Sequence, residues 1–185
     1  MLEQPVVEVA VSHLAVALRR LAHELPRLLE LLPLRRRQLR HRSRTELIRR
    51  AEAVEPKINA FAFTYFDEAL AKARKAEAKF AKTDGRIRAL EGIPLAVKDE
   101  MDIKGKPMTN GSLYLKDNVS TTTHYSVERL LRAGAIVHAR TTTPEFSCAG
   151  VAHSRVHGVT GTPWNPAHTC GGSSGGSGAS LAAGS

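Results

Sequence analysis

The stretch Ile93–Asp99, which reads IPLAVKD, decides how this chain folds. It begins with a short apolar run of the kind typical of a buried strand. A helical pattern follows over residues 127–133 and stops at Gly134, and a second apolar run occupies residues 135–139. A strand, a helix and a strand in this order predict a right-handed crossover between parallel strands. We therefore expect an α/β fold with a mixed, mostly parallel central sheet flanked by helices.

Helical patterns precede this stretch. Val6–Leu32 carries leucines at helical spacing. A second helix is predicted to begin at Ser43, where Glu46 completes a capping box, and to end at Pro56. A third is predicted over Phe66–Lys82, where alanines recur among lysines and glutamates. A helical first half thus precedes the strand-containing second half.

The charge of the chain is concentrated in one place. The 185 residues include 27 Lys and Arg against 18 Asp and Glu, a formal net charge of +9. Arginines cluster between Arg35 and Arg50, whereas lysines beyond Ala51 alternate with acids, as on a solvated helix face. Aromatic residues, which stack on bases, make up only 5%. This local patch argues against nucleic-acid binding, and the 42% hydrophobic content is that of a globular protein.

Nothing in the sequence points to a membrane, a leader peptide or a metal. No apolar run approaches the ~18–20 residues that span a bilayer, and the N-terminus lacks a signal-peptide pattern. Cys148 and Cys170 lack zinc-site spacing and are expected to be reduced thiols. The remaining candidate ligands are histidines, which we expect to be surface or loop residues: His124, His138, His153, His157 and His168. We therefore expect a cytoplasmic protein without a metal site.

The run GGSSGGSG, Gly171–Gly178, has two interpretations. Gly/Ser runs are commonly flexible linkers, which polar or charged sequence should flank. This run instead continues into Ala179–Ala183, a good start for a buried helix, and such loops aim backbone N–H groups at anionic centres. It matches no nucleotide-binding fingerprint. A literal GxSxG lies at Gly171–Gly175, but Pro163–Cys170 before it is not the apolar strand that a nucleophile elbow needs.

Lys98 ends the first predicted strand. A lysine at a strand end is usually a surface residue, but here the preceding apolar run would carry the side chain toward the interior. Burial disfavours the ammonium form. A neutral lysine can accept a proton from a serine hydroxyl, and no histidine is then required. Lys98 and the Gly/Ser run together are therefore typical of a hydrolase that activates a serine with a lysine.

With these motifs the chain from about Ser43 to Ser185 resembles the amidase signature family. Each stretch that carries the likeness is weak alone, but together they follow the family's order: Ser43–Phe61, Leu90–Asp99, Gly105–Ser112, Thr143–Phe146, Gly161–Pro166 and Gly171–Ser177. The resemblance implies the amidase signature fold, incomplete in this chain. It also implies hydrolysis of a carboxylic amide through an acyl-serine intermediate, without a cofactor or metal.

The resemblance further implies a Ser-cisSer-Lys triad. By motif position, Lys98 is the catalytic base, and Ser173 is the middle serine, which relays a proton and is held by a non-proline cis peptide bond. Three neighbours are expected to support the loop and the substrate: Gly172, Ser174 and Gly175. The family's nucleophilic serine lies in a second Gly-rich segment, which would follow Ser185. We therefore expect these residues to supply the base and the relay but no attacking group, and to be inactive alone.

The likeness divides the chain into two parts. Residues 1–42 are expected to form a variable N-terminal helical extension, Arg-rich at its end. Residues 43–185 are expected to be the N-terminal portion of a truncated amidase signature domain. Two positions depart from the family pattern: Glu100 and Thr142 each stand where Asn is common. Both departures are expected to alter loop hydrogen bonds or substrate preference and to leave the triad positions intact.

Two alternatives stay open. Within the family, the chain could belong to the glutaminase subunit of the aspartyl/glutamyl-tRNA amidotransferase, which supplies ammonia to a partner. Only this alternative brings tRNA as a partner. In a different class, the chain would be a non-catalytic anion-binding module built on the Gly/Ser loop, and it would then fold stably by itself. The main interpretation expects a small-molecule amide as the partner, involves no membrane and leaves a homodimer open.

Overall fold

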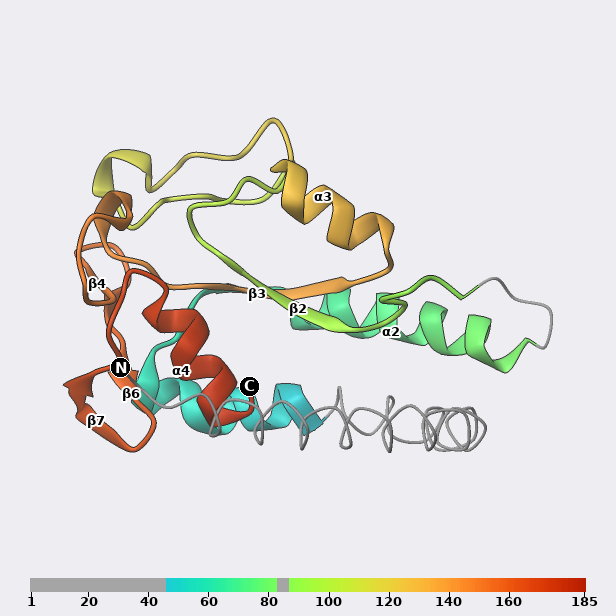
Figure 1. Cartoon of the computed structure of the whole chain (residues 1–185), viewed down its shortest axis with the longest axis horizontal. Helices are drawn as coiled ribbons and strands as arrows, with labels where there is room; N and C mark the ends of the chain where they lie inside the picture. Colours follow the sequence, from blue (N-terminus) through green and yellow to red (C-terminus); the bar gives the residue numbers. More distant parts are fainter. Residues whose placement is uncertain (1–45, 83–86) are drawn as a thin grey trace, which may run out of the picture. The chain divides into compact units, whose positions relative to one another are not determined.

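The computed structural model describes residues 46–82 and 87–185 (Figure 1). Three predictions lie outside the described residues: the helix over Val6–Leu32, the cap at Ser43 and the helical extension over residues 1–42. Among the residues that are described, no helix is both long and apolar enough to cross a membrane.

The described chain contains helices, 3-10 turns and strands. The helical elements are the helix over residues 46–58, α2 (Phe66–Ala81), α3 (Tyr125–Arg132) and α4 (Gly175–Ala183), with 3-10 turns η1 (Leu113–Leu115) and η2 (Glu145–Ser147). The strands are β1 (Phe61–Thr64), β2 (Pro94–Lys98), β3 (Ile136–Thr141), β4 (His153–Ser154), β5 (Gly158–Val159), β6 (Gly161–Thr162) and β7 (Asn165–Thr169).

The central sheet has the strand order β1-β3-β2. Strands β2 and β3 pair in parallel, and α3 connects them, so the predicted strand-helix-strand crossover is confirmed. Strand β1 pairs with β3 in the antiparallel direction, which makes the sheet mixed. All of β3 is buried because it has a strand on each side and helices on both faces. The predicted α/β class is therefore confirmed.

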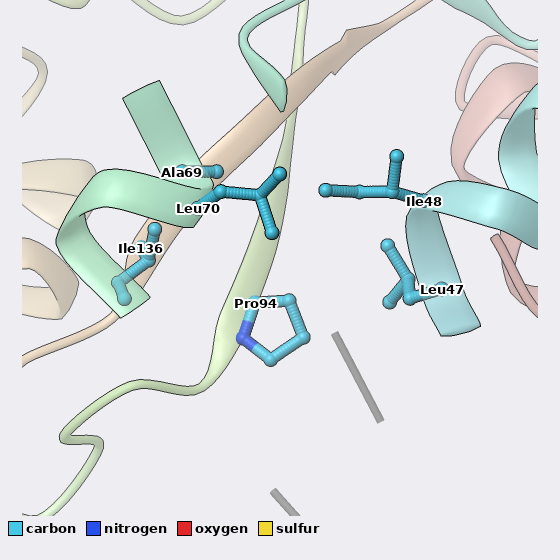
Figure 2. Close-up of a pocket in the computed structure, with 6 residues that line it drawn as sticks. All are labelled: Leu47, Ile48, Ala69, Leu70, Pro94 and Ile136. Atoms are coloured by element: carbon cyan, nitrogen blue, oxygen red, sulfur yellow. The ribbon is translucent and has the colours of Figure 1, made fainter. Parts of the chain in front are cut away.

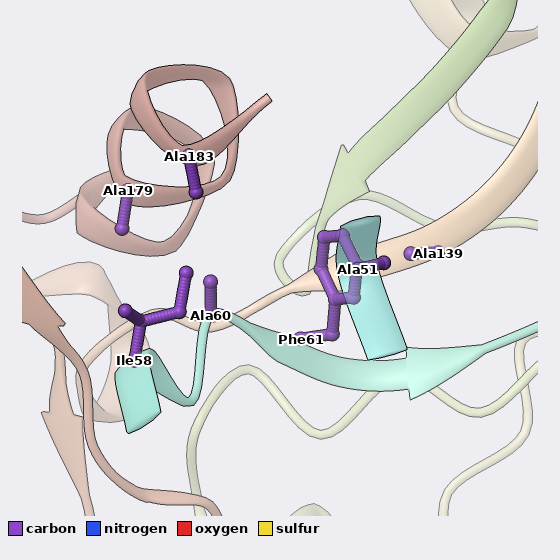
Figure 3. Close-up of a cluster of buried hydrophobic side chains, with 7 residues drawn as sticks. All are labelled: Ala51, Ile58, Ala60, Phe61, Ala139, Ala179 and Ala183. Atoms are coloured by element: carbon purple, nitrogen blue, oxygen red, sulfur yellow. The ribbon is translucent and has the colours of Figure 1, made fainter. Parts of the chain in front are cut away.

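Helices cover the sheet from two sides (Figure 1). On one face, Val127 of α3 packs against Val97 of β2 and Val137 of β3. On the other face, α2 packs its alanines against Ile136, and α4 lies against Ala139. Figure 3 shows this second contact, in which α4 directs small side chains toward the helix over residues 46–58 and strand β1. Small residues let the backbone of α4 approach the sheet closely, and the loop before α4 is held there.

The helix over residues 46–58 corrects one prediction. It does not end at Pro56 but continues to residue 58. A proline in the last turn removes one N–H donor, yet the amide of Asn59 still bonds to the carbonyl of Glu55 at 2.9 Å. Asn59 then takes a positive φ of 50°, as residues that end helices often do. The two additional residues are stabilised by the burial of the Ile58 side chain.

Two short hairpins lie between residues 153 and 169. Strand β4 pairs with β5, and β6 pairs with β7, both in the antiparallel direction. Strand β7 falls within Pro163–Cys170, the stretch that we expected not to be an apolar strand. It is exposed along its whole length and belongs to a separate two-stranded sheet. It is therefore not the apolar central strand of a nucleophile elbow.

His138 is not the surface or loop residue that we expected. It lies within β3, and the residue is only 4% exposed. Its ring makes an edge contact with Phe61, with ring centroids 5.8 Å apart. The prediction was wrong because it relied on the polarity of histidine, whereas position 138 lies inside the apolar run over residues 135–139 that indicates a buried strand.

A small apolar pocket of about 10 Å³ lies beside the sheet (Figure 2). Its lining comes from four elements: Leu47, Ile48, Ala69, Leu70, Pro94 and Ile136. Figure 2 shows Leu70 of α2 and Ile48 pointing toward each other across it. None of the sequence-predicted site residues lines this pocket.

Candidate active site

Lys98 and Ser173 lie together, although 75 positions separate them in the sequence. Lys98 is the last residue of β2, paired in register with Thr141 at the end of β3. Its side chain is only 10% exposed. The Nζ atom donates a hydrogen bond to Ser173 Oγ at 2.7 Å. The parallel pairing with β3 fixes where β2 ends. The end of β2 in turn places the amine of Lys98 beside the loop that carries Ser173.

Ser173 lies in the loop between β7 and α4, and its peptide bond to Gly172 is cis. This is the backbone geometry that the family resemblance implied for the middle serine. A Cβ at Gly172 would lie 2.5 Å from the backbone nitrogen of Val151, closer than any side chain allows. The loop therefore requires glycine at this position in order to run alongside residue 151.

The start of α4 has the same requirement. A Cβ at Gly175 would lie 2.6 Å from Ala152 Cβ and 2.7 Å from Cys170 Sγ. Ser174 behaves differently, because it is exposed and its side chain makes no capping hydrogen bond to α4. Only its carbonyl takes part, accepting from the amide of Gly178 at 3.1 Å. Gly175 thus sets the packing of the loop, and Ser174 contributes through its backbone.

Glu100 is a second polar partner of Lys98. Its Oε2 lies 3.2 Å from Lys98 Nζ, and the same carboxylate oxygen accepts a hydrogen bond from the Ser147 hydroxyl. Partial burial acts to raise the pKa of Glu100, but the bond from Ser147 and the contact with Lys98 outweigh it and lower the pKa. An ionised carboxylate thus faces the amine.

A buried ion pair lies directly behind Lys98. The side chains of Asp99 and Arg140 are both fully buried, with Arg140 Nε 3.0 Å from Asp99 Oδ1. Asp99 also accepts hydrogen bonds from the amide and hydroxyl of Thr109. His157 Nε2 lies 2.8 Å from Thr109 Oγ1 and 3.5 Å from Asp99 Oδ2. Burial acts to raise the pKa of Asp99, but these bonds and the Arg140 charge outweigh it and lower the pKa.

This network holds the chain directly after Lys98. Arg140 also donates to the carbonyl of Met101, and the amide of Asp99 bonds to the carbonyl of Thr141 at 3.0 Å. The segment that follows β2 is therefore tied to the end of β3. Removing either charge would release the turn that carries the lysine.

Sequence reasoning located Lys98 and Ser173 but missed the residues around them. Glu100 was noted only as a departure from a pattern, and Ser147 was not singled out. A signal existed for Glu100, because a carboxylate two positions after a partly buried lysine can reach it around a turn. His157 is a loop residue as expected, but its side chain is only 10% exposed and faces Asp99. No local sequence pattern predicts the contact between His157 and Asp99, because the two residues are 58 positions apart in the sequence.

The assembled groups can transfer protons. The amine of Lys98 lies at hydrogen-bonding distance from the hydroxyl of Ser173 and at ion-pair distance from the carboxylate of Glu100. Over residues 46–82 and 87–185, no three or more His, Cys, Asp or Glu side chains are grouped to hold a metal ion. The chemistry that these residues support is exchange of a proton between the amine of Lys98 and the hydroxyl of Ser173.

Comparison with known proteins finds similarity over the same region in which the sequence motifs lie. The family model described as Amidase matches residues 43–185. The chain is 42% identical over 135 residues to an indoleacetamide hydrolase of Bradyrhizobium diazoefficiens, covering 73% of this chain and 26% of that protein. It is 41% identical over 140 residues to a glutamyl-tRNA(Gln) amidotransferase subunit of a Picosynechococcus species, covering 76% of this chain and 29% of the relative.

A solved structure supports the match. A bacterial aryl acylamidase of the amidase signature family superposes with a TM-score of 0.71 at 25% identity, over 81% of this chain and 31% of that one. The chain therefore spans roughly a quarter to a third of the length of these proteins. On the family match and these similarities, the chain belongs to the amidase signature family.

Proposed function

We propose that the protein hydrolyses a carboxylic amide through an acyl-serine intermediate, with Lys98 as the general base and Ser173 as the proton relay. The observation that carries this proposal is the 2.7 Å hydrogen bond between Lys98 Nζ and Ser173 Oγ. A serine held in this way can give its proton to the amine while it accepts one from a second hydroxyl. The pair therefore activates a nucleophile without a histidine.

The attacking group is proposed to be a serine in a second Gly-rich segment, outside these 185 residues. Its oxygen attacks the amide carbonyl while its proton passes through Ser173 to Lys98. The same route returns the proton to the leaving amine, so that ammonia or an amine departs and an ester to serine remains. Water then cleaves that ester with Lys98 again acting as the base. Because the attacking serine lies outside them, the 185 residues alone are expected to be inactive.

Gly172, Ser174 and Gly175 are proposed to keep the relay loop in place. The close approach of the Val151 backbone to Gly172 supports this role. The substrate is proposed to be a small-molecule amide, and the reaction needs no cofactor or metal. The cytoplasmic location and a homodimer also remain proposals.

The test is an assay of amide hydrolysis on two proteins. One is the 185-residue chain, and the other extends it with the sequence that follows Ser185 in its gene. Release of ammonia or amine is measured on glutamine, on indoleacetamide and on an aryl anilide. In the extended protein, Lys98→Ala and Ser173→Ala are expected to lower kcat by about 10³-fold or more, because each removes a step of proton transfer. Lys116→Ala and Ser126→Ala, at exposed positions, serve as controls and are expected to change little.

Two results would contradict the proposal. One is full activity in the Lys98→Ala variant, since that variant lacks the amine that is proposed to take the proton from Ser173. The other is a coding sequence in which no Gly-rich segment with a serine follows in frame. Hydrolysis by the 185 residues alone would contradict their proposed inactivity. It would not contradict the proposed roles of Lys98 and Ser173.

A second candidate function is that of a glutaminase within a tRNA amidotransferase, since a relative 41% identical to the chain is named as a subunit of such an enzyme. Such a protein would release ammonia from glutamine and pass it to a partner. A glutaminase assay with and without partner subunits and charged tRNA separates the two candidates. Stimulation by the partners favours the amidotransferase, and activity on other amides without them favours the amidase.

A further inference from the structure

Lys98 has two polar partners on its Nζ atom. One is the hydroxyl of Ser173 at 2.7 Å, and the other is the carboxylate of Glu100 at 3.2 Å. The proposed mechanism uses only the first. The contact is partly shielded from water, because the two side chains are 10% and 31% exposed. A partly buried ion pair is screened less than one at the surface, so the two charges interact more strongly than they would in water.

The carboxylate of Glu100 is itself held in place. Ser147 donates its hydroxyl to Glu100, and that hydroxyl lies 2.9 Å from Thr143 Oγ1. Thr143 is almost fully buried at the end of the segment that follows β3. The chain of contacts from Lys98 through Glu100 and Ser147 therefore ends on a buried residue.

The turn that carries Ser147 has an unusual backbone. Phe146 and Ser147 have positive φ values of 49° and 55°, although neither is glycine. Such conformations cost free energy and persist only where the surroundings fix them. Here the amide of Phe146 bonds to the carbonyl of Asn110 at 2.8 Å, and Ser112 Oγ donates to the Glu145 carboxylate at 2.7 Å. The turn is thus anchored from both sides in a shape that presents Ser147 to Glu100.

We propose that Glu100 is the positioning residue of Lys98: its carboxylate holds the amine beside Ser173 and stabilises the ammonium that forms when Lys98 accepts the proton. In proton balance, Ser173 gives up its proton as it receives another, Lys98 gains one, and Glu100 stays ionised throughout. A base that is oriented by a third group is the general arrangement of serine and cysteine triads. The catalytic part of this inference rests on the proposed function.

Other charges around Lys98 do not duplicate this effect. Asp99 points the other way, into its pair with the buried Arg140, so those two charges offset each other. Helix α4, on the Ser173 side, has no titratable side chain. His124, at the start of α3, acts on Glu100 and favours its ionised form. Within the described residues, Glu100 is thus the acid that contacts the amine.

The test follows the ¹³Cε chemical shift of Lys98 by NMR from pH 6 to pH 10.5 in the chain labelled with [¹³C]lysine. The signal is assigned by its absence in Lys98→Met. Replacing Glu100 with Gln removes the charge and keeps the shape, so the pH at which Lys98 is half-deprotonated should fall by about one unit, a tenfold change in the equilibrium. Glu100→Asp should restore a large part of that shift. The matched control is Glu128→Gln, which removes a carboxylate that pairs with Arg132 on α3.

A second variant covers the case in which Glu100→Gln does not fold. Ser147→Ala leaves both charges in place but frees the carboxylate, and it should shift the midpoint in the same direction by a smaller amount. The proposal is overturned if folded Glu100→Gln titrates like the wild type, or if Glu128→Gln shifts Lys98 equally. The measurement needs no amide hydrolysis, so its outcome is separate from that of the activity assay on Lys98→Ala.

Discussion

At the scale of single residues, His138 makes the protein sensitive to acid. Burial lowers the pKa of His138 from 6.5 to about 4, and the nearby backbone of Leu95 opposes this only in part. The unfolded chain therefore binds a proton at a higher pH than the folded protein does. Stability from the neutral ring is fully present above pH 6.5 and is lost as the pH falls toward 4.

The first prediction concerns this histidine. Between pH 7 and pH 5, the free energy of unfolding should fall by about 2 kcal/mol through His138 alone. His138→Leu should lose that part of the decrease, because leucine has about the same volume and takes up no proton. His168→Gln, at an exposed strand position, is the control and should keep it. Urea unfolding at the two pH values measures the effect, and an unchanged pH dependence in His138→Leu would refute it.

At the scale of elements, α4 depends on glycines where it meets the sheet. A Cβ at Gly176 would lie 2.5 Å from the nitrogen of Thr142 and 2.7 Å from the carbonyl oxygen of Ala60. These are backbone atoms beside β3 and β1, and they cannot rotate away as a side chain can. Gly178 lies on the same helix with open space around it. The two glycines therefore offer a matched pair.

The second prediction uses that pair. Gly176→Ala should destabilise the protein by about 2 kcal/mol or more, because α4 must move away from the sheet. Gly178→Ala should stabilise it by up to about 1 kcal/mol, because alanine favours an open helix position. Thermal unfolding measures both changes. The displaced α4 should also carry Ser173 away from Lys98. Equal effects of the two substitutions would show that α4 does not pack as described.

At the scale of the whole molecule, local patterns predicted the elements better than the contacts between them. Periodicity located α2, α3 and β2 to within one or two residues, since helix and strand spacing are written in consecutive positions. It did not locate the turn at Phe146 and Ser147, because no glycine marks their positive φ. Likewise, it did not predict the contact of Glu100 with Lys98, because the Glu100 carboxylate is held by Ser147, which is distant in the sequence. The pairing of Lys98 with Ser173 was predicted from the family resemblance and not from the spacing of the two residues.

The buried pair of Asp99 and Arg140 links four parts of the molecule. Arg140 belongs to β3, Asp99 follows β2, and Thr109 and His157 attach the next loop and the β4–β5 turn to the same carboxylate. Two unpaired charges at this depth would each be costly, so each partner is tolerated because the other is present. The pair is expected to act as one unit in stability.

The third prediction tests that unit with a double-mutant cycle. Asp99→Asn leaves the Arg140 charge buried without its counter-charge, and Arg140→Met does the same to Asp99, so each should cost about 3–5 kcal/mol. The double variant should cost clearly less than the sum, with a coupling of about 2 kcal/mol or more in urea unfolding. The exposed pair Glu128 and Arg132 is the control, and its coupling should stay near 0.3–0.5 kcal/mol. Additive costs at Asp99 and Arg140, within about 0.5 kcal/mol, would mean that the two charges do not hold the Lys98 turn together.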